Sequence, residues 1–304
     1  MKLWERYYTP RTVEEAIDLL ERHAGAARVV AGGTDLLLEI KQGHRPPAEA
    51  LVDITCIPEL AQIEQEDGTA LIGAGVTHSA IVHSDLLATG ATCLVESCGV
   101  VGGPQVRNIA TLGGNVAHAL PAADGTTSLV ALDAEAEVWQ GGSRRWLPIQ
   151  ELFRGPGQSL LDPTRDLLLR FRFRLHSPGE GSAFKRIMRP QGVALPVLGC
   201  ALWVRLGADD ETVEEARVCV SPIAPVPVRA ESVEAALRGQ PYSDSLLDEV
   251  VQVARRDLKP RTSKYRATSE YRVEMVEVLL RRALPLAIRR ARTGEVVPEG
   301  VGIQ

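Results

Sequence analysis

Long hydrophobic runs are absent from this sequence of 304 residues. No apolar stretch approaches the ~20 residues that a transmembrane helix needs. The N-terminal residues, M-K-L-W-E-R-Y-Y, also lack the apolar core of a signal peptide. These two absences argue against a membrane span and against secretion, and we expect a cytoplasmic protein.

Neither sign of charge dominates the chain. The sequence has 34 Lys and Arg against 39 Asp and Glu, a net charge of −5, and the two signs are interspersed. Nucleic acids and anionic membrane surfaces attract clustered basic residues, so we expect neither as a partner. Hydrophobic residues make up 45% of the chain, and its length suits roughly two domains with cores of their own.

Metal-binding and nucleophile motifs are also missing. The five cysteines form no C-x-x-C pair, and no histidine pair joins a Glu in a zinc-protease pattern. We interpret the cysteines as small core residues and His118 as a surface or packed histidine. No paired carboxylates, G-x-S-x-G turn or Cys/His signature marks a catalytic centre. The sequence therefore predicts no metal site and no catalytic residue on this chain.

Two glycine-rich segments are the most informative feature that is present. Each combines adjacent glycines with a hydroxyl and an Asp or Asn, so side chains are missing where a phosphate approaches and hydrogen-bonding groups stand beside the gap. The alternative is two ordinary tight turns. The candidate phosphate-binding residues are Val29, Val30, Ala31, Gly32, Gly33, Thr34, Asp35 and Leu36 in the first segment, and Thr111, Gly113, Gly114 and Asn115 in the second.

The first segment has the pattern of a strand, a loop and a short helix. Residues 28–31 are rich in β-branched side chains, and a helix is expected from Thr34 or Asp35. This arrangement turns backbone N–H groups toward the loop, where an anion would accept hydrogen bonds from them. Asp35 would not neutralise a phosphate, and we expect it to cap the helix or orient the loop.

Other patterns predict further elements. Thr12-Val13-Glu14-Glu15 is a capping box, residues 138–147 are typical of a hairpin around Gly141-Gly142, and residues 167–175 alternate between apolar side chains and arginines as in a half-buried strand. We interpret the arginines as the solvated or partner-facing side of that strand. Helices are expected over 232–237, 246–256 and 270–282, and the turn-rich residues 176–182 form a candidate domain boundary.

The order of these motifs resembles the FAD-binding medium subunit of the molybdenum hydroxylases, the family of xanthine dehydrogenase and aerobic carbon monoxide dehydrogenase. The resemblance covers almost the whole chain. It is carried by A-G-G-T-D-L-L (31–37), R-N-I-A-T-L-G-G-N (107–115), P-A-A-D (121–124), A-F-K-R (183–186), P-V-P-V-R-A (225–230) and S-E-Y-R (269–272).

The resemblance implies an α+β fold. A two-subdomain FAD-binding domain of the vanillyl-alcohol oxidase/PCMH type would span residues 1–176. A smaller α+β domain would span 182–290, and a tail 291–304. The cofactor implied for this chain is FAD, with both glycine segments on its pyrophosphate and ribityl.

The resemblance also implies roles for three residues outside the glycine segments. Asp124 matches an acidic residue on the sugar–adenine portion of FAD, although a turn or helix cap is the alternative. Leu168 matches an apolar residue near the flavin, or Leu167 does if the strand register shifts. Lys185 matches a lysine near the isoalloxazine edge, where a cation stabilises the anionic reduced flavin; from the residues alone it reads as a solvated lysine.

The partners implied are a small subunit with two 2Fe–2S clusters and a large subunit with molybdopterin, and the assembly implied is a dimer of heterotrimers. Electrons would leave FAD for NAD or another acceptor, which stays open because residues 191–193 lack an acidic residue of some NAD-using relatives. The substrate is a purine, another N-heterocycle, an aromatic compound or CO; Thr34-Asp35, where the CO-oxidising relatives have His-Ser, favours the first three. A stand-alone oxidase of the vanillyl-alcohol oxidase type and an FAD-free binding or assembly protein are the alternatives.

Overall fold

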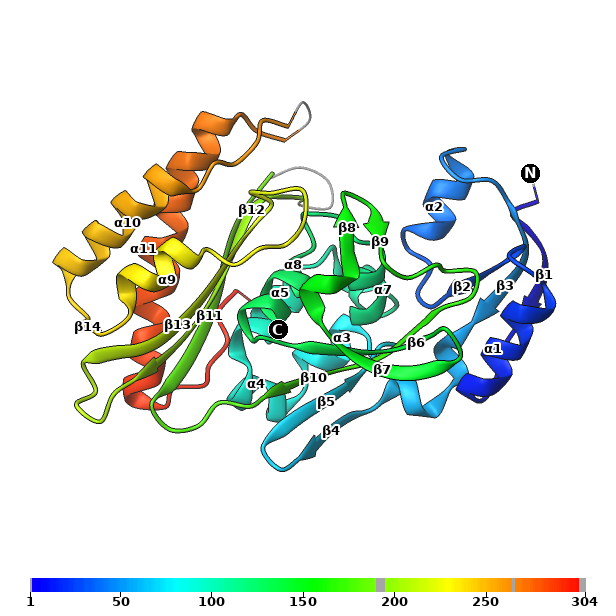
Figure 1. Cartoon of the computed structure of the whole chain (residues 1–304), viewed down its shortest axis with the longest axis horizontal. Coiled ribbons are helices and arrows are strands. Elements are labelled where there is room, and N and C mark those ends of the chain that lie inside the picture. The colour runs from blue at the N-terminus through cyan, green and yellow to red at the C-terminus, as the bar shows by residue number, and fades with distance from the viewer. Residues whose placement is uncertain (1, 190–194, 264–265, 301–304) are drawn as a thin grey trace.

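The computed structural model describes residues 2–189, 195–263 and 266–300. Figure 1 shows three regions in a row: a small N-terminal sheet with its helices, a central sheet with several short helices, and a C-terminal sheet covered by long helices. The chain is α+β, as the sequence predicted. Within the described residues, no helix combines the length and the apolar character that crossing a bilayer requires.

The N-terminal region is a three-stranded parallel sheet. Strands β1 (Trp4–Tyr8), β2 (Ala27–Val30) and β3 (Ala48–Asp53) lie in the order β1-β3-β2. Helix α1 (Val13–Arg22) begins where predicted, because Thr12 accepts a hydrogen bond from the amide of Glu15. Helix α2 (Leu36–Lys41) follows the first glycine segment, and two 3₁₀ turns, η1 (Ile54–Cys56) and η2 (Pro58–Ala61), lead to the next sheet.

The central region contains a five-stranded antiparallel sheet in the order β4-β5-β10-β6-β7. Its strands are β4 (Ile63–Glu66), β5 (Thr69–Gly73), β6 (Glu135–Gln140), β7 (Ser143–Pro148) and β10 (Leu167–Arg174), and the predicted hairpin is β6–β7. The helices are α3 (His78–Val82), α4 (Asp85–Gly90), α5 (Thr92–Gly99), α6 (Pro104–Arg107), α7 (Leu112–Ala117) and α8 (Asp124–Ala131). A 3₁₀ turn η3 (Ile149–Leu152) and the pair β8 (Phe153–Gly155) and β9 (Gln158–Ser159) complete it.

The middle strand β10 contains a bulge that changes which face its side chains occupy. Its pairing with β6 skips one residue between Leu168 and Arg170. As a result Leu167 and Leu169 pack in the core of the N-terminal sheet, whereas Phe171 and Phe173 pack in the core of the central region. A regular strand would put all four side chains on one face.

The arginines of β10 form ion pairs on the sheet surface. Arg170 contacts Glu137 at 2.6 Å and Arg172 contacts Glu135 at 2.7 Å. Both guanidinium groups also lie over the ring of Trp146. Their charge is therefore matched within the sheet, and they do not form a free basic patch.

The C-terminal region is a four-stranded sheet covered on one face by three helices. The strands β11 (Glu180–Met188), β12 (Pro196–Leu206), β13 (Thr212–Ser221) and β14 (Gln240–Pro241) are consecutive neighbours. The helices are α9 (Glu231–Leu237), α10 (Asp244–Asp257) and α11 (Ser269–Thr293). The opposite face of the sheet packs on α5 and α8 of the central region.

The last helix differs from the sequence prediction in length. We expected it to end at Arg282, with a tail from 291, but α11 continues through Pro285 to Thr293. Proline removes one backbone hydrogen bond, and the continued apolar stripe of Ala283, Leu284 and Ala287 against the sheet offsets that loss.

Candidate functional site

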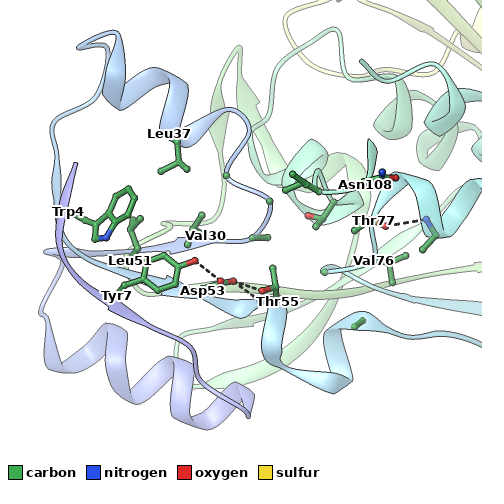
Figure 2. A pocket seen from close by; sticks show the side chains of 18 residues that line it. Trp4, Tyr7, Val30, Leu37, Leu51, Asp53, Thr55, Val76, Thr77 and Asn108 are labelled. Carbon is green, nitrogen blue, oxygen red and sulfur yellow. Dashed lines mark hydrogen bonds between the residues drawn. The ribbon is translucent and has the colours of Figure 1, made fainter. Parts of the chain in front are cut away.

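A cavity of about 950 Å³ lies between the N-terminal sheet and the loops around α3 and α6. In Figure 2, Trp4, Tyr7 and Asp53 line it from one side and Thr77 and Asn108 from the other. The first glycine segment therefore lines the same cavity as Asn108, Ile109 and Thr111, at the start of the second segment. The family resemblance implied that the two segments lie together.

Two of the glycines are required by the protein backbone itself. A Cβ at Gly32 would lie 2.2 Å from the carbonyl oxygen of Ile109, and a Cβ at Gly113 would lie 2.4 Å from that of Ala74. We had expected this space to be left for a phosphate, but neighbouring backbone fills it. Gly32 and Gly113 thus permit close backbone contacts, and of the two Gly32 lines the cavity.

Gly33 and the residues after it supply free donors. Gly33 has φ +65°, a conformation that favours glycine. In the described chain, the amides of Gly33, Thr34 and Asp35 donate to no protein acceptor. Three neighbouring N–H groups without partners form the kind of nest that binds an anion.

Asp35 stands at the N-cap position of α2, but its side chain makes no capping hydrogen bond. Our expectation of a cap is therefore wrong. Its Oδ1 lies instead 3.9 Å from Nε2 of His118, which is also 3.7 Å from a carboxylate oxygen of Glu39. Asp35 thus lies near the residue that follows α7, and the other role we considered, orienting the loop, stays a prediction.

The second glycine segment uses most of its donors internally. The amides of Leu112 and Gly113 donate to the carbonyls of Val76 and Ala74, and the amide of Gly114 donates to the Thr111 hydroxyl. At and beside this segment, the amides of Thr77 and Thr111 are without an acceptor in the described residues.

Thr77 and Thr111 face each other in an isolated antiparallel bridge. Within the described residues neither of their amides has an acceptor, and both residues line the cavity. Thr77, the N-cap of α3, was not among the residues predicted for the site.

The aromatic end of the cavity was also missed. Trp4 and Tyr7 lie 5.9 Å apart between ring centroids, and the Tyr7 hydroxyl donates to Oδ2 of Asp53 at 2.6 Å. Burial and the Asp53 carboxylate raise the pKa of Tyr7 to about 12, so the phenol stays a donor. No motif in the sequence marked these two residues, because the pairing of β1 with β3 is what brings them to the cavity.

The remaining predicted residues lie apart from this cavity. Asp124 begins α8, is buried, and contacts Arg186 of β11 at 2.6 Å. Burial raises the pKa of Asp124 to about 6, although Arg186 opposes the shift. Asn115 accepts a hydrogen bond from the amide of Thr126 and so ties α7 to α8. The Asp124–Arg186 pair belongs to the junction between the central and C-terminal regions, and the Asn115 contact lies within the central region.

Leu168 and Lys185 are likewise outside the cavity lining. Leu168 is buried in the central core. Lys185 lies on β11 and forms an ion pair with Glu299 at 2.7 Å. Residues 191–193, used above to discuss the acceptor, lie outside the described residues.

A buried histidine supports the second glycine segment. His78 begins α3, and its amide donates to the carbonyl of Ala110. Its Nδ1 has no partner in the described structure. Burial, followed by the charge of Arg107, lowers the pKa of His78 to about 4.

We expect this histidine to make the fold sensitive to acid. An unfolded His78 binds a proton near pH 6.5, whereas the folded one does not until about pH 4. Stability is therefore complete above pH 6.5 and falls as the pH drops toward 4, by roughly 3 kcal/mol for this group. Thermal melts between pH 7.5 and 4.5 should show a smaller loss for His78→Gln than for wild type. His83→Gln, at the exposed residue that follows the same helix, is the control, and equal slopes for all three proteins would contradict the assignment.

Comparison with known families shows which family the chain belongs to. Residues 3–173 match the FAD binding domain in molybdopterin dehydrogenase, and residues 182–287 match the CO dehydrogenase flavoprotein C-terminal domain. The chain belongs to the molybdopterin dehydrogenase flavoprotein family. The family that the motifs resembled is confirmed, and the chain is an FAD-binding oxidoreductase component.

The sequence similarity to known proteins extends over nearly the whole chain. The xanthine dehydrogenase FAD-binding subunit of Escherichia coli O157:H7 is 30% identical over 289 residues, which are 94% of this chain and 96% of the relative. The carbon monoxide dehydrogenase medium chain of Hydrogenophaga pseudoflava is 29% identical, over 93% of this chain and 97% of the relative. A solved structure of carbon monoxide dehydrogenase from that organism aligns with TM-score 0.88 over 95% of this flavoprotein and 99% of the matched chain.

Proposed function

We propose that this flavoprotein is the FAD-carrying electron-transfer subunit of a molybdenum hydroxylase complex. It receives electrons from iron–sulfur clusters on a small subunit and passes them to NAD or another acceptor, while a large subunit with molybdopterin oxidises the substrate. The observation that supports this most directly is the set of unpaired amides at Gly33, Thr77 and Thr111 around one cavity. Residues 1–176 and 182–290 are its proposed domains, and the cytoplasm is its proposed location.

The donor chemistry of the cavity fits the middle of an FAD molecule. Two phosphates carry negative charge and need several N–H donors. Gly33 lines one wall with an amide that has no acceptor in the described chain, and the free amides of Thr34 and Asp35 follow it; Thr77 and Thr111 line the other wall. When bound there, FAD would supply a centre that accepts electrons in pairs and releases them.

The positions of the cavity and of Asp124 suggest how the bound FAD is oriented. The cavity reaches Trp4, Tyr7 and Asp53 on one side, where aromatic rings and a carboxylate suit an adenine and a ribose. Asp124 and Lys185 lie on the other side, at the C-terminal sheet. We therefore propose the flavin end for Asp124, where the resemblance implied the adenosine end, and keep Leu168 at the flavin end. The place of Lys185 beside the flavin stays a prediction from the resemblance, because Lys185 shares the face of β11 with Ala183 and Ile187 of the C-terminal core.

Replacing Trp4 with alanine tests this orientation. We expect FAD affinity to fall by about tenfold, because a stacked base loses roughly 1–3 kcal/mol when its aromatic partner is removed. The absorption spectrum of the remaining bound flavin should not change, since the isoalloxazine lies elsewhere. Asp124→Asn, in contrast, should shift the absorption spectrum of the bound flavin. A spectral shift in Trp4→Ala without one in Asp124→Asn would reverse the assignment.

Purification tests the function itself. The full chain should carry about one dissociable FAD, released by heat or acid, and dithionite should bleach it. The organic substrate should reduce this flavin only in the assembled complex, because we recognise no substrate-oxidising centre in the sequence. Reduction of the isolated chain by the substrate would favour the stand-alone oxidase, and absence of FAD would favour a binding or assembly protein.

A further inference from the structure

His118 connects the two parts of the chain that contain the glycine segments. It comes directly after α7, and its amide donates to the carbonyl of Gly114 in the second segment. Its Nε2 lies 3.9 Å from Oδ1 of Asp35 in the first segment and 3.7 Å from Oε1 of Glu39 on α2. The His118 side chain is 17% exposed, so solvent screens these contacts only in part. One imidazole therefore faces two carboxylates beside the segments that line the cavity.

Asp35 puts a negative charge next to the amides that would face a phosphate. Its own amide and those of Gly33 and Thr34 have no acceptor in the described chain, and Gly33 lines the cavity. Two residues of chain span at most about 7 Å, and charges interact over a Debye length of about 8 Å at physiological ionic strength. The carboxylate therefore opposes a phosphate at Gly33 unless a cation neutralises it.

The other charged groups near the histidine leave it as the cation that can do so. Glu39 has a second partner, Arg45. Helix α7 has no charged side chain, and Asp124, the next charged residue along the chain, is paired within the junction to β11. The turn between β8 and β9 reaches the residue after the histidine through a backbone hydrogen bond, and the charged side chain of that strand pair, Arg154, is exposed. In the described residues, the ion-pair contact of Asp35 is the one with the histidine.

We propose that His118 is a positioning residue for the first glycine segment, and that its protonated form holds and neutralises Asp35, so that the cavity binds the FAD pyrophosphate more tightly as the pH falls. This inference rests on the proposed FAD function and adds a pH-dependent control of the same site. Histidine is the side chain whose charge ordinarily changes between pH 5 and 8. The imidazolium attracts both carboxylates, whereas the neutral ring leaves the charge of Asp35 beside the phosphates.

The first test measures the FAD dissociation constant of the full chain, freed of cofactor, by flavin fluorescence at about pH 5.5 and about pH 8. The gain in affinity at the lower pH should be about two- to fivefold larger in wild type than in His118→Gln, the range of a partly exposed ion pair. His118→Arg keeps the cation and should keep the tighter binding at both pH values. Burial raises the pKa of Asp124 to about 6, but that group titrates in all these proteins, so the comparison removes its contribution.

Two further variants serve as controls for this test. His83→Gln should keep the wild-type pH dependence, because His83 is exposed and its Nδ1 contacts the Ser79 carbonyl of its own helix. Asp35→Asn removes the carboxylate, so it should tighten FAD binding at the higher pH and diminish the effect of His118→Gln. Equal pH dependence in wild type and His118→Gln would overturn the proposal, as would an undiminished effect of His118→Gln in the Asp35→Asn background.

Inorganic pyrophosphate separates this inference from the proposed function. It presents two phosphates without adenosine or flavin, and calorimetry measures its binding to the full chain at the same two pH values. Tighter binding at the lower pH in wild type than in His118→Gln supports the role of His118. If the wild-type chain binds no FAD, the proposed function fails and the pyrophosphate comparison alone decides. Equal pyrophosphate binding by the two proteins, or none by either, then overturns the inference.

Discussion

Gly32→Ala is expected to abolish FAD binding and to lower the free energy of unfolding by about 3 kcal/mol, the upper range of overpacking. The added methyl group would stand 2.2 Å from the carbonyl oxygen of Ile109. That atom belongs to backbone, so no side-chain rotation relieves the clash. The loop that presents the Gly33 amide and the loop that presents the Thr111 amide must then separate.

Gly155→Ala provides the control for this prediction. A Cβ at Gly155 meets only the flexible side chain of Gln158, and the residue is in strand β8. Flavin absorbance after gel filtration measures FAD occupancy, and chemical denaturation measures stability. Full occupancy together with wild-type stability in Gly32→Ala would show that the two loops are not joined as described.

Arg290→Met is expected to destabilise the chain by about 3–5 kcal/mol, because it leaves the Glu96 carboxylate buried without its counter-charge. The pair is 2% and 1% exposed, so water does not replace the lost partner. The same change removes the donors to Ser182 and Val297.

Two further variants separate charge from packing. Arg289→Met alters the neighbouring arginine, whose side chain is half exposed, and should cost less than about 1 kcal/mol. The double variant Arg290→Met/Glu96→Gln should recover part of the loss, since no uncompensated charge remains. Urea denaturation measures all four proteins. A loss in Arg290→Met no greater than in Arg289→Met would contradict the description of the pair.

Local sequence patterns predicted local structure well. The Thr12 capping box starts α1, and the alternation over 167–175 marks β10, because each depends on groups a few residues apart. The bulge in β10 and the continuation of α11 past Pro285 were not predicted. Both depend on apolar surfaces supplied by distant parts of the chain, which override local preferences.

At the candidate site, the sequence could not show what each glycine is for. A missing side chain leaves room either for a ligand or for another part of the backbone, and the sequence does not distinguish the two. At Gly33 the glycine permits a left-handed turn beside free amides, whereas at Gly32 and Gly113 it permits backbone contact. Trp4 and Tyr7 were missed because only the pairing of β1 with β3 brings them to the cavity.

The bulge in β10 couples the unfolding of the two sheets in the N-terminal half of the chain. Leu167 and Leu169 are part of one core, and Phe171 and Phe173 are part of another, although the four residues lie on a single strand. Neither core can lose this strand without exposing apolar side chains of the other. We therefore expect the two sheets to melt in one cooperative transition, and hydrogen exchange in β2 and in β5 to report the same global opening.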